Sequence, residues 1–421
     1  MPLTDISGSV IVNSTDSLQT ALGRVTGGSL ILEPGVYKGN FLLERQVNIV
    51  CKRGAVLDGE GKGDVFRVTA SNVSIRGCTI QNWGDDLTAM DAGIVVKKTA
   101  DNVVIEDNKL HGITFGIFLD ASPNTKVINN EIRGVAQVRS QDRGNGIHLY
   151  AATGADVAFN IVSETRDGIY IDTSNKNTIR NNEFHHLRYG VHYMYSYSNT
   201  VSNNYTHNTR TGYALMQSKY LVVTNNRSEN DENYGILINY ITNSTISGNT
   251  VHRATSGATL AGGGAVQGAE GKSLFIYNSL YNTITNNTLA ESDLGIHITA
   301  GSEDNIIAGN NFIGNQQQVK YVSNVTQEWS KDGTGNYWSD YLGWDRNNNG
   351  TGDIPYEPND GIDKLLWKYP SAKVLMNSPA IETLRWIQRE FPVLKSPGVK
   401  DSYPLMRPSK PLISQVPESA Q

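Results

Sequence analysis

The chain has few charged residues, no long basic segment and no long apolar segment. Charged residues make up 18% of its 421 residues, and the formal net charge is −5. An acidic balance without a basic run does not indicate a nucleic-acid partner or an anionic membrane surface. No stretch approaches the roughly 20 apolar residues that a membrane-spanning helix needs. These absences argue against a nucleic-acid-binding protein and against a helix that crosses a membrane.

Cysteine is also scarce. The two cysteines, Cys51 and Cys78, end the similar strings VNIVC and VSIRGC, about one repeat apart. They are either small stacked core residues or a disulfide, and a disulfide would require an oxidising compartment. The chain opens with Met-Pro-Leu and runs into strand-like sequence without a signal peptide. A secreted protein whose signal peptide has been removed would look like this.

Glycine, by contrast, is abundant, with 41 copies, and it recurs at a regular spacing. From Gly146 to Gly235 the spacings are 22, 22, 22 and 23 residues. A phrase of Gly followed by alternating apolar residues begins at Gly93, Gly116, Gly146, Gly168, Gly190, Gly212, Gly235 and Gly295, with Ser273 in place of Gly in one repeat. A fixed period of this length is the signature of a solenoid, in which each repeat packs only on its neighbours.

Asparagine follows the same period. The strand after each Gly phrase ends in Asn, at Asn130, Asn160, Asn182, Asn204, Asn226, Asn249, Asn287 and Asn310. Asn tolerates left-handed backbone and bonds locally in turns, and stacked Asn side chains can bond to one another along a solenoid. Gly would give a second corner its permissive backbone. We therefore predict an all-β fold, a right-handed parallel β-helix with coils of roughly 22 residues.

The repeat also predicts the domain organisation. We expect the β-helix to span residues 1–328, with insertions near 134–145 and 254–271, and residues 329–421 to form a capping or docking tail. A short capped helix from Asp16 to Leu22 would close the N-terminal end, because an open solenoid edge invites aggregation. The irregular tail contains one predicted helix, over residues 379–390, whose apolar side carries Ile381, Leu384, Ile387 and Phe391.

Alternation along the strands separates core residues from outward residues. The first and third positions after the repeat Gly are almost wholly apolar and face the core, so the second and fourth face outward. His192 and Met194 then share an outer face, and Met216 follows in the column of Met194, one coil or roughly 4.8 Å away. Thioethers select Cu(I), and imidazole accepts several metals. This pattern predicts a copper site at His192, Met194 and Met216; the alternative is that both Met side chains pack beneath the insertion or the tail.

Three further histidines are weaker candidates for metal ligands. His148 lies two coils before His192 in the same outward column. His185 and His207 share a second outward column, which follows the Asn positions. These two could bind a metal together or could simply be solvated, because histidine is common in polar turns.

A weak calcium-like loop occurs in the tail. Oxygen-bearing side chains alternate through it and Gly350 is at the sixth place, as at the start of an EF-hand loop. The twelfth place is Tyr356 rather than Glu, so the bidentate ligand is missing, and a tight polar turn is the alternative. The candidate calcium ligands are Asp345, Asn347, Asn349 and Asp353.

Enzyme chemistry has less support. Parallel β-helices often process acidic polysaccharides, which requires an acid, a base and a group that neutralises the substrate carboxylate. Asp120 and Asp172 share an outward column, but they are two coils apart with Tyr150 between them. We therefore expect a binding protein rather than an enzyme, with a carbohydrate-active lyase or epimerase as the alternative.

Four strings carry a family resemblance. VHYMYSYSNT, GYALMQS, GNYWSDYLGWDRNNNGTGDIPY and DSYPLMRP resemble the NosD family of periplasmic β-helix proteins in nitrous oxide reductase maturation. The resemblance covers nearly the whole chain, from the VNIV strand to Pro408. The Trp-rich string is far more specific than the Asn repeat, which many carbohydrate-binding β-helices share.

The resemblance implies a function in copper transfer. NosD-like proteins act with an ABC transporter, formed by a membrane subunit and its ATPase. They are thought to take Cu(I) from a membrane-anchored lipoprotein chaperone and pass it to apo nitrous oxide reductase. On this view His192, Met194 and Met216 are the copper ligands, and the insertion at 254–271 and the tail helix are candidate docking or moving parts.

Overall fold

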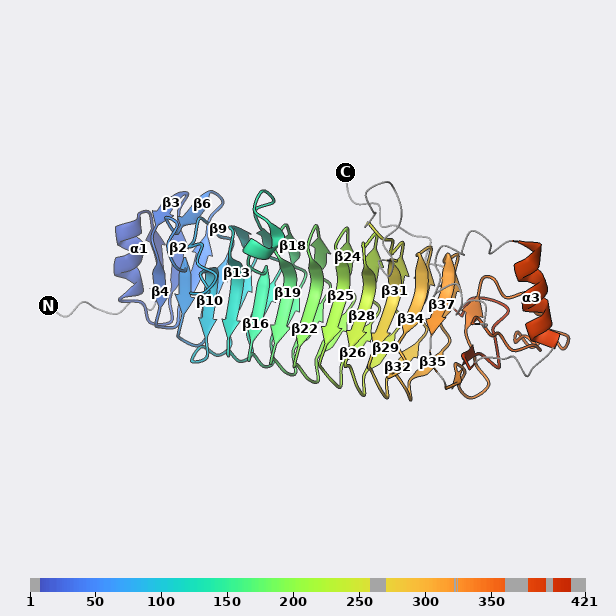
Figure 1. Ribbon diagram of the computed structural model, residues 1–421. Coiled ribbons are helices and arrows are strands. Elements are labelled where there is room, and N and C mark those ends of the chain that lie inside the picture. The colour runs from blue at the N-terminus through green and yellow to red at the C-terminus, as the bar shows by residue number, and fades with distance from the viewer. Residues whose placement is uncertain are drawn as a thin grey trace.

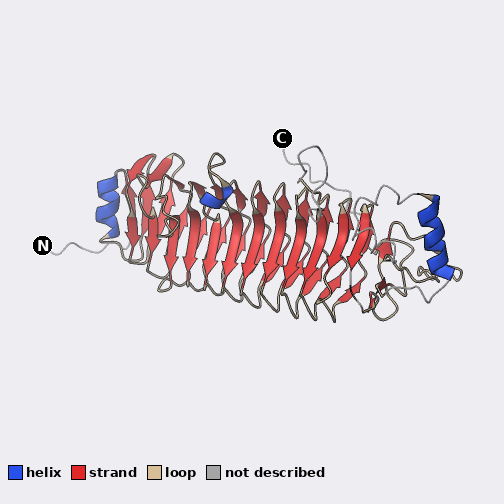
Figure 2. Cartoon of the chain, in the orientation of Figure 1, coloured by secondary structure: helices blue, strands red, loops and turns tan. Residues whose placement is uncertain are grey.

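A computed structural model describes residues 8–257, 270–321, 323, 325–359, 378–390 and 397–409. Its strands wind into an elongated solenoid with a helix at each end, α1 (Thr15–Leu22) and α3 (Pro379–Glu390) (Figure 1). Strands account for nearly all of the regular structure (Figure 2). The prediction of an all-β, right-handed parallel β-helix is therefore confirmed. The described residues include no helix with both the length and the apolar character of a membrane span.

Each coil contributes one strand to each of three parallel sheets. Sheet 1 has 13 described strands: β1 (Ser9–Val12), β2 (Ser29–Leu32), β5 (Asn48–Cys51), β8 (Ser74–Arg76), β11 (Val104–Glu106), β14 (Lys126–Ile128), β17 (Asp156–Ala158), β20 (Thr178–Arg180), β23 (Thr200–Ser202), β26 (Val222–Thr224), β29 (Thr245–Ser247), β32 (Thr283–Thr285) and β35 (Ile306–Ala308).

Sheet 2 also has 13 described strands: β3 (Gly35–Lys38), β6 (Ala55–Asp58), β9 (Thr79–Gln81), β12 (Lys109–His111), β15 (Glu131–Arg133), β18 (Ile161–Ser163), β21 (Glu183–His185), β24 (Tyr205–His207), β27 (Arg227–Glu229), β30 (Thr250–His252), β33 (Thr288–Ala290), β36 (Asn311–Ile313) and β39 (Tyr337–Trp338). Its last strand ends ten residues beyond the predicted boundary at residue 328, because Trp338 still packs into the core. The division into two domains stays a prediction.

Sheet 3 carries the predicted copper ligands and has 12 described strands: β4 (Phe41–Leu43), β7 (Phe66–Val68), β10 (Ala92–Lys97), β13 (Phe115–Asp120), β16 (Ile147–Tyr150), β19 (Asp167–Asp172), β22 (Tyr189–Met194), β25 (Thr211–Met216), β28 (Tyr234–Asn239), β31 (Lys272–Tyr277), β34 (Leu294–Ile298) and β37 (Gln317–Tyr321). A separate pair, β38 (Gln327–Glu328) and β40 (Val399–Lys400), joins the tail to the end of the solenoid.

A ladder of buried asparagines runs along one corner of the coils. In a typical step, Asn204 Nδ2 donates to Asn226 Oδ1 and to the carbonyl of Ile179, each at 3.0 Å. Asn204 Oδ1 accepts from the backbone and side-chain nitrogens of Asn182. The predicted stacking of Asn side chains is confirmed. The ladder continues beyond the predicted positions, and its described members are Asn108, Asn130, Asn160, Asn182, Asn204, Asn226, Asn249, Asn287, Asn310 and Asn336.

The repeat glycines have a different role from the one predicted. Gly168 and its counterparts do not have positive φ, so permissive backbone is not what they provide. A Cβ on Gly168 would lie 2.5 Å from the carbonyl oxygen of Gly190 and 2.5 Å from Phe184 Cδ1. Glycine is required because this position faces the core at a point where neighbouring coils leave no room for a side chain.

The two cysteines form a disulfide. Cys51 and Cys78 lie on consecutive coils, are both buried, and are bonded to each other. The alternative of a reduced pair of stacked core residues is therefore wrong for this structure.

Each end of the solenoid carries the helix that the sequence predicted. Ser14 caps α1 and forms a capping box with Ser17. The insertion at 134–145 contains one short helix, η1 (Ser140–Asp142), and most of the insertion at 254–271 lies outside the described residues. The predicted tail helix is observed as α3, with Ile381 buried and Leu384 exposed. Phe391, also assigned to its apolar side, lies outside the described residues.

Candidate copper site

Met194 is the last residue of β22 and Met216 is the last residue of β25. These two strands are neighbours in sheet 3 (Figure 1). They directly follow Tyr193 and Leu215, which are paired across β22 and β25 and are both fully buried. Alternation therefore turns the two thioethers away from the core, and both residues are partly exposed, as predicted. Two soft donors thus lie on one outer surface, separated by about one interstrand spacing of 4.8 Å.

His192 lies two residues before Met194 on the same face of β22. Its Nδ1 is 2.9 Å from Asp167 Oδ2, and its ring stacks on Tyr170 with a centroid separation of 4.5 Å. Arg188 holds the same carboxylate through two hydrogen bonds, of 2.8 and 2.6 Å. Because Nδ1 donates to Asp167, the lone pair of the neutral ring lies on Nε2. A carboxylate that fixes the other ring nitrogen is the usual support of a metal-binding histidine.

Asp167 was missed from the sequence. Burial raises the pKa of this carboxyl, but hydrogen bonds from His192 and Arg188 outweigh burial and hold the pKa below its ordinary value. Strict alternation would place Asp167 on the core side, two positions before Ile169. Gly168 breaks the alternation because it faces inward beside Ile169, so Asp167 turns out toward His192. The sequence signal that could have identified Asp167 is its position directly before a repeat Gly.

His148 lies in the outward column of sheet 3, as predicted, but its side chain is buried. It faces away from the core of the solenoid, but only 6% of it is exposed. Phe115, Phe118 and Tyr170 pack around its ring at centroid separations of 5.3, 4.9 and 4.9 Å. Burial lowers its pKa to about 4. Tyr170 lies between His148 and His192, so the structure does not bring these two rings together.

The second histidine column is present on sheet 2. His185 and His207 are paired across β21 and β24, and their rings stack at 5.0 Å. His186, which sequence reasoning overlooked, adds a third ring: its Nδ1 lies 2.8 Å from Nδ1 of His185. The ring of His207 contacts other residues. Its Nε2 lies 3.2 Å from Glu183 Oε1, and its Nδ1 lies 2.9 Å from Asn208 Nδ2.

The side-chain oxygens of the calcium-like loop accept hydrogen bonds from the backbone of the same loop. The two carboxylate oxygens of Asp345 accept from the backbone N–H groups of Asn349 and Gly350, at 3.2 and 2.8 Å. Asp353 accepts from the N–H of Arg346, and Asn347 accepts from that of Asn349. These contacts describe a tight polar turn, and calcium binding stays a prediction.

No group of three or more His, Cys, Asp or Glu side chains is arranged to hold a metal within the residues described above. The site predicted at His192, Met194 and Met216 contains one residue of these four types and two methionines.

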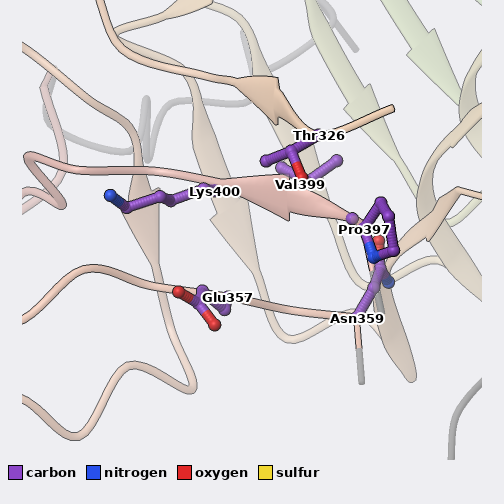
Figure 3. Close-up of a pocket in the computed structure, with 7 residues that line it drawn as sticks. Thr326, Glu357, Asn359, Pro397, Val399 and Lys400 are labelled. Atoms are coloured by element: carbon purple, nitrogen blue, oxygen red, sulfur yellow. The ribbon is translucent and has the colours of Figure 1, made fainter. Parts of the chain in front are cut away.

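Two surface hollows lie among the described residues. One, of about 470 Å³, lies in the turns that directly follow the two methionines and is lined by Tyr195, Tyr197, Gln217, Ser218, Lys219, Tyr240 and Thr242. Another, of about 200 Å³, lies where the tail meets the solenoid (Figure 3) and includes Glu357 and Lys400. The second hollow contains none of the predicted metal ligands.

Comparison with known proteins agrees with this architecture. Residues 58–162 match the right-handed β-helix region. An exopolygalacturonase of family 28 from Yersinia enterocolitica superposes with a TM-score of 0.60 over 74% of this chain and 75% of that chain, at 13% identity. PfbA, a surface adhesin of Streptococcus pneumoniae, superposes with a TM-score of 0.54 over 73% and 88%, at 11% identity. Likenesses at this identity show a shared fold alone.

Sequence relatives are much more specific. The chain is 57% identical over 388 residues to a protein of Stutzerimonas stutzeri named probable ABC transporter binding protein NosD, covering 92% of this chain and 89% of the relative. It is 58% identical over 380 residues to the protein of the same name from Pseudomonas aeruginosa, covering 90% and 88%. Residues 128–343, which include both methionines, match the family described as periplasmic copper-binding protein NosD. The chain therefore belongs to the NosD family.

Proposed function

We propose that this chain is a periplasmic carrier that holds Cu(I) as cargo at His192, Met194 and Met216. It would act with an ABC transporter and deliver the ion for assembly of the copper sites of nitrous oxide reductase. The observation that carries the proposal is the pair of thioethers in one outward column of sheet 3, beside a histidine whose Nδ1 is fixed by a carboxylate.

The donor set suits Cu(I). Thioether sulfur and imidazole nitrogen are soft to borderline ligands, whereas Mg²⁺ and Ca²⁺ prefer oxygen. Partial exposure of Met194 and Met216 allows a partner to reach the ion. Two neutral sulfurs and one neutral nitrogen would hold Cu(I) without the thiolate that makes release slow, and this suits transfer better than storage.

The Cys51–Cys78 disulfide supports the periplasmic assignment, because disulfides persist in oxidising compartments. The proposed partners are the membrane subunit of the transporter and its ATPase, a lipoprotein copper chaperone as donor and apo nitrous oxide reductase as acceptor. The relatives are named as ABC transporter binding proteins, which supports the first of these assignments.

We also propose that the chain binds rather than catalyses. Asp120, the carboxylate nearest the N-terminal end of the candidate column, pairs with Lys97 at 2.7 Å. Asp172 is two coils further on, with Tyr150 between them. A glycoside hydrolase needs two carboxyl groups that flank one bond, and these two residues do not offer that arrangement.

The test is an anaerobic Cu(I) titration against a competing chelator, with the parent chain and a Met194→Leu/Met216→Leu variant. Leucine keeps the side-chain volume nearly unchanged, so the fold should be retained. We expect one Cu(I) per parent chain and an affinity lower by roughly 100-fold or more in the variant, since chelating ligands act together.

Two controls make the result specific. Met90→Leu removes a thioether that is 40% exposed and lies outside the column, and it should change nothing. A Cys51→Ser/Cys78→Ser variant shows whether reductant has opened the disulfide and created thiolate ligands. Equal Cu(I) affinity in the parent chain and the Met194/Met216 variant would rule out the proposed ligands.

A further inference from the structure

His185 and His186 form a pair whose ring nitrogens face each other on sheet 2. Their Nδ1 atoms are 2.8 Å apart and their ring planes are nearly perpendicular, at 86°. His185 ends β21, and His186 occupies the next corner with φ of 55°. His185 is half-buried and His186 is exposed, so solvent reaches the pair.

This separation matches that of two adjacent ligands on one metal ion. Imidazole nitrogen binds first-row divalent ions at about 2.0–2.1 Å, and two such ligands at a right angle lie about 2.9 Å apart. Without a metal, only one proton fits between the two Nδ1 atoms, so one ring donates and the other accepts. A cation in place of that proton would be bound by both lone pairs after a rotation of each ring, because at these bond lengths the metal lies beside the line that joins the two Nδ1 atoms.

Two nearby carboxylates act in favour of a positive charge at His185. Glu164 and Glu183 both act electrostatically on His185, and each favours a positive charge there. The pKa of His185 nevertheless lies below its ordinary value, chiefly because of burial and then because of His207 and His186.

His207 is not a third ligand of the same ion. Its ring stacks on that of His185, with an interplanar angle of 20°, and its two nitrogens already contact Glu183 and Asn208. A metal lying in the plane of the His185 ring would lie outside the plane of the His207 ring. The protein thus supplies two ligands, and water would complete the coordination.

We propose that His185 and His186 bind one borderline divalent cation through their two Nδ1 atoms, at a site separate from the thioether pair. Cu²⁺ is the ion of this class with the highest affinity for nitrogen ligands, so it is the probe of choice. The proposal adds His186 to the residues that the sequence singled out and removes His207 as a ligand. It does not depend on the Cu(I) site, because it involves a different sheet and a different class of donor.

The experiment is an aerobic titration with Cu²⁺ at pH 7.5, followed by electron paramagnetic resonance of the one-equivalent complex. We expect saturable binding of one Cu²⁺ and nitrogen superhyperfine structure. His185→Gln and His186→Asn should each lower the affinity by roughly 100-fold, because the second ligand binds intramolecularly. Asparagine tolerates the left-handed conformation of residue 186, so that variant should fold.

The matched controls are His252→Gln and the Met194→Leu/Met216→Leu variant. His252 lies in the same column of sheet 2 and is held by Glu229 and Glu291. Both controls should bind Cu²⁺ like the parent chain. Absence of saturable binding by the parent chain, or unchanged affinity in a folded His186→Asn variant, would overturn the proposal. Loss of Cu(I) binding in the methionine variant with Cu²⁺ binding retained would show that the two sites are separate.

Discussion

Asp231 is a fully buried carboxyl group that the coils surround with hydrogen-bond donors. It accepts from the backbone N–H and the hydroxyl of Thr209, at 2.8 and 2.7 Å, and from the hydroxyls of Ser228 and Thr206. Burial nevertheless raises its pKa to about 6, because these donors are neutral and only partly compensate for lost hydration. The site therefore stabilises the protonated acid more than the carboxylate.

The raised pKa predicts a pH-dependent stability. A carboxyl whose folded-state pKa lies above its unfolded value stabilises the fold below about pH 4 and loses that contribution as the pH rises toward 6. Asp231→Asn keeps a polar amide and removes the charge. Relative to the parent chain, we expect the variant to gain roughly 2 kcal/mol between pH 4.5 and pH 7.5.

Denaturant unfolding of both proteins at the two pH values measures this difference. Comparison with the parent at each pH cancels the other titrating groups, such as Glu164 and Glu229, whose pKa values are lowered. A difference between variant and parent that is the same at both pH values would show that Asp231 is already ionised at low pH in the folded protein.

At the scale of the element, the Asn ladder is the main network of buried side-chain hydrogen bonds in the β-helix. Each buried amide satisfies groups on its own coil and on both neighbouring coils, so one substitution leaves several groups unpaired. Removing Asn204 would leave the backbone and side-chain nitrogens of Asn182 without their acceptor.

We expect Asn204→Ala to lower the free energy of unfolding by about 2–4 kcal/mol, since each buried unsatisfied group costs about 1–3 kcal/mol. Asn203→Gly is the matched control, because Asn203 is exposed and glycine accepts its φ of 55°. The control should change stability much less, as judged by the denaturation midpoint. Equal losses of stability in the Asn204→Ala and Asn203→Gly variants would mean that the ladder contributes no more to stability than the turn conformation does.

The elements also show why the site was only partly predictable. Period-two alternation places Met194 and Met216 outward, because it depends on local backbone geometry alone. The burial of His148 depends on Phe115 and Phe118, which belong to an apolar cluster on the outside of sheet 3 together with Leu87. The buried members of that cluster lie on β10 and β13, but Leu87 comes from the loop before β10, and no repeat determines the path of that loop.

At the scale of the whole molecule, the repeat predicted the architecture and most of the core. The tail was less predictable because it has no period. Asp401, 65 residues after Asn336, accepts from the backbone of Asn336 at 2.7 Å and from Trp338 Nε1 at 2.8 Å. This contact could not be predicted from the sequence, because Asp401 is far from Asn336 in the chain. It joins the tail to Asn336, the last described member of the Asn ladder.

The solenoid also explains how one chain could offer two different metal sites. Sheets 2 and 3 present separate columns of side chains, so we expect a substitution in one column to leave the other in place. Soft sulfur donors lie on sheet 3 and imidazole pairs on sheet 2, so the two oxidation states of copper would be bound at different places.

The central claim is that methionine sulfur binds the Cu(I) cargo, and X-ray absorption spectroscopy of the Cu(I)-loaded chain with its disulfide intact tests it most directly. We predict sulfur scatterers together with nitrogen in the first coordination shell, and loss of the sulfur contribution in the Met194→Leu/Met216→Leu variant. A shell of nitrogen and oxygen only, or sulfur scattering that persists in that variant, would contradict the account.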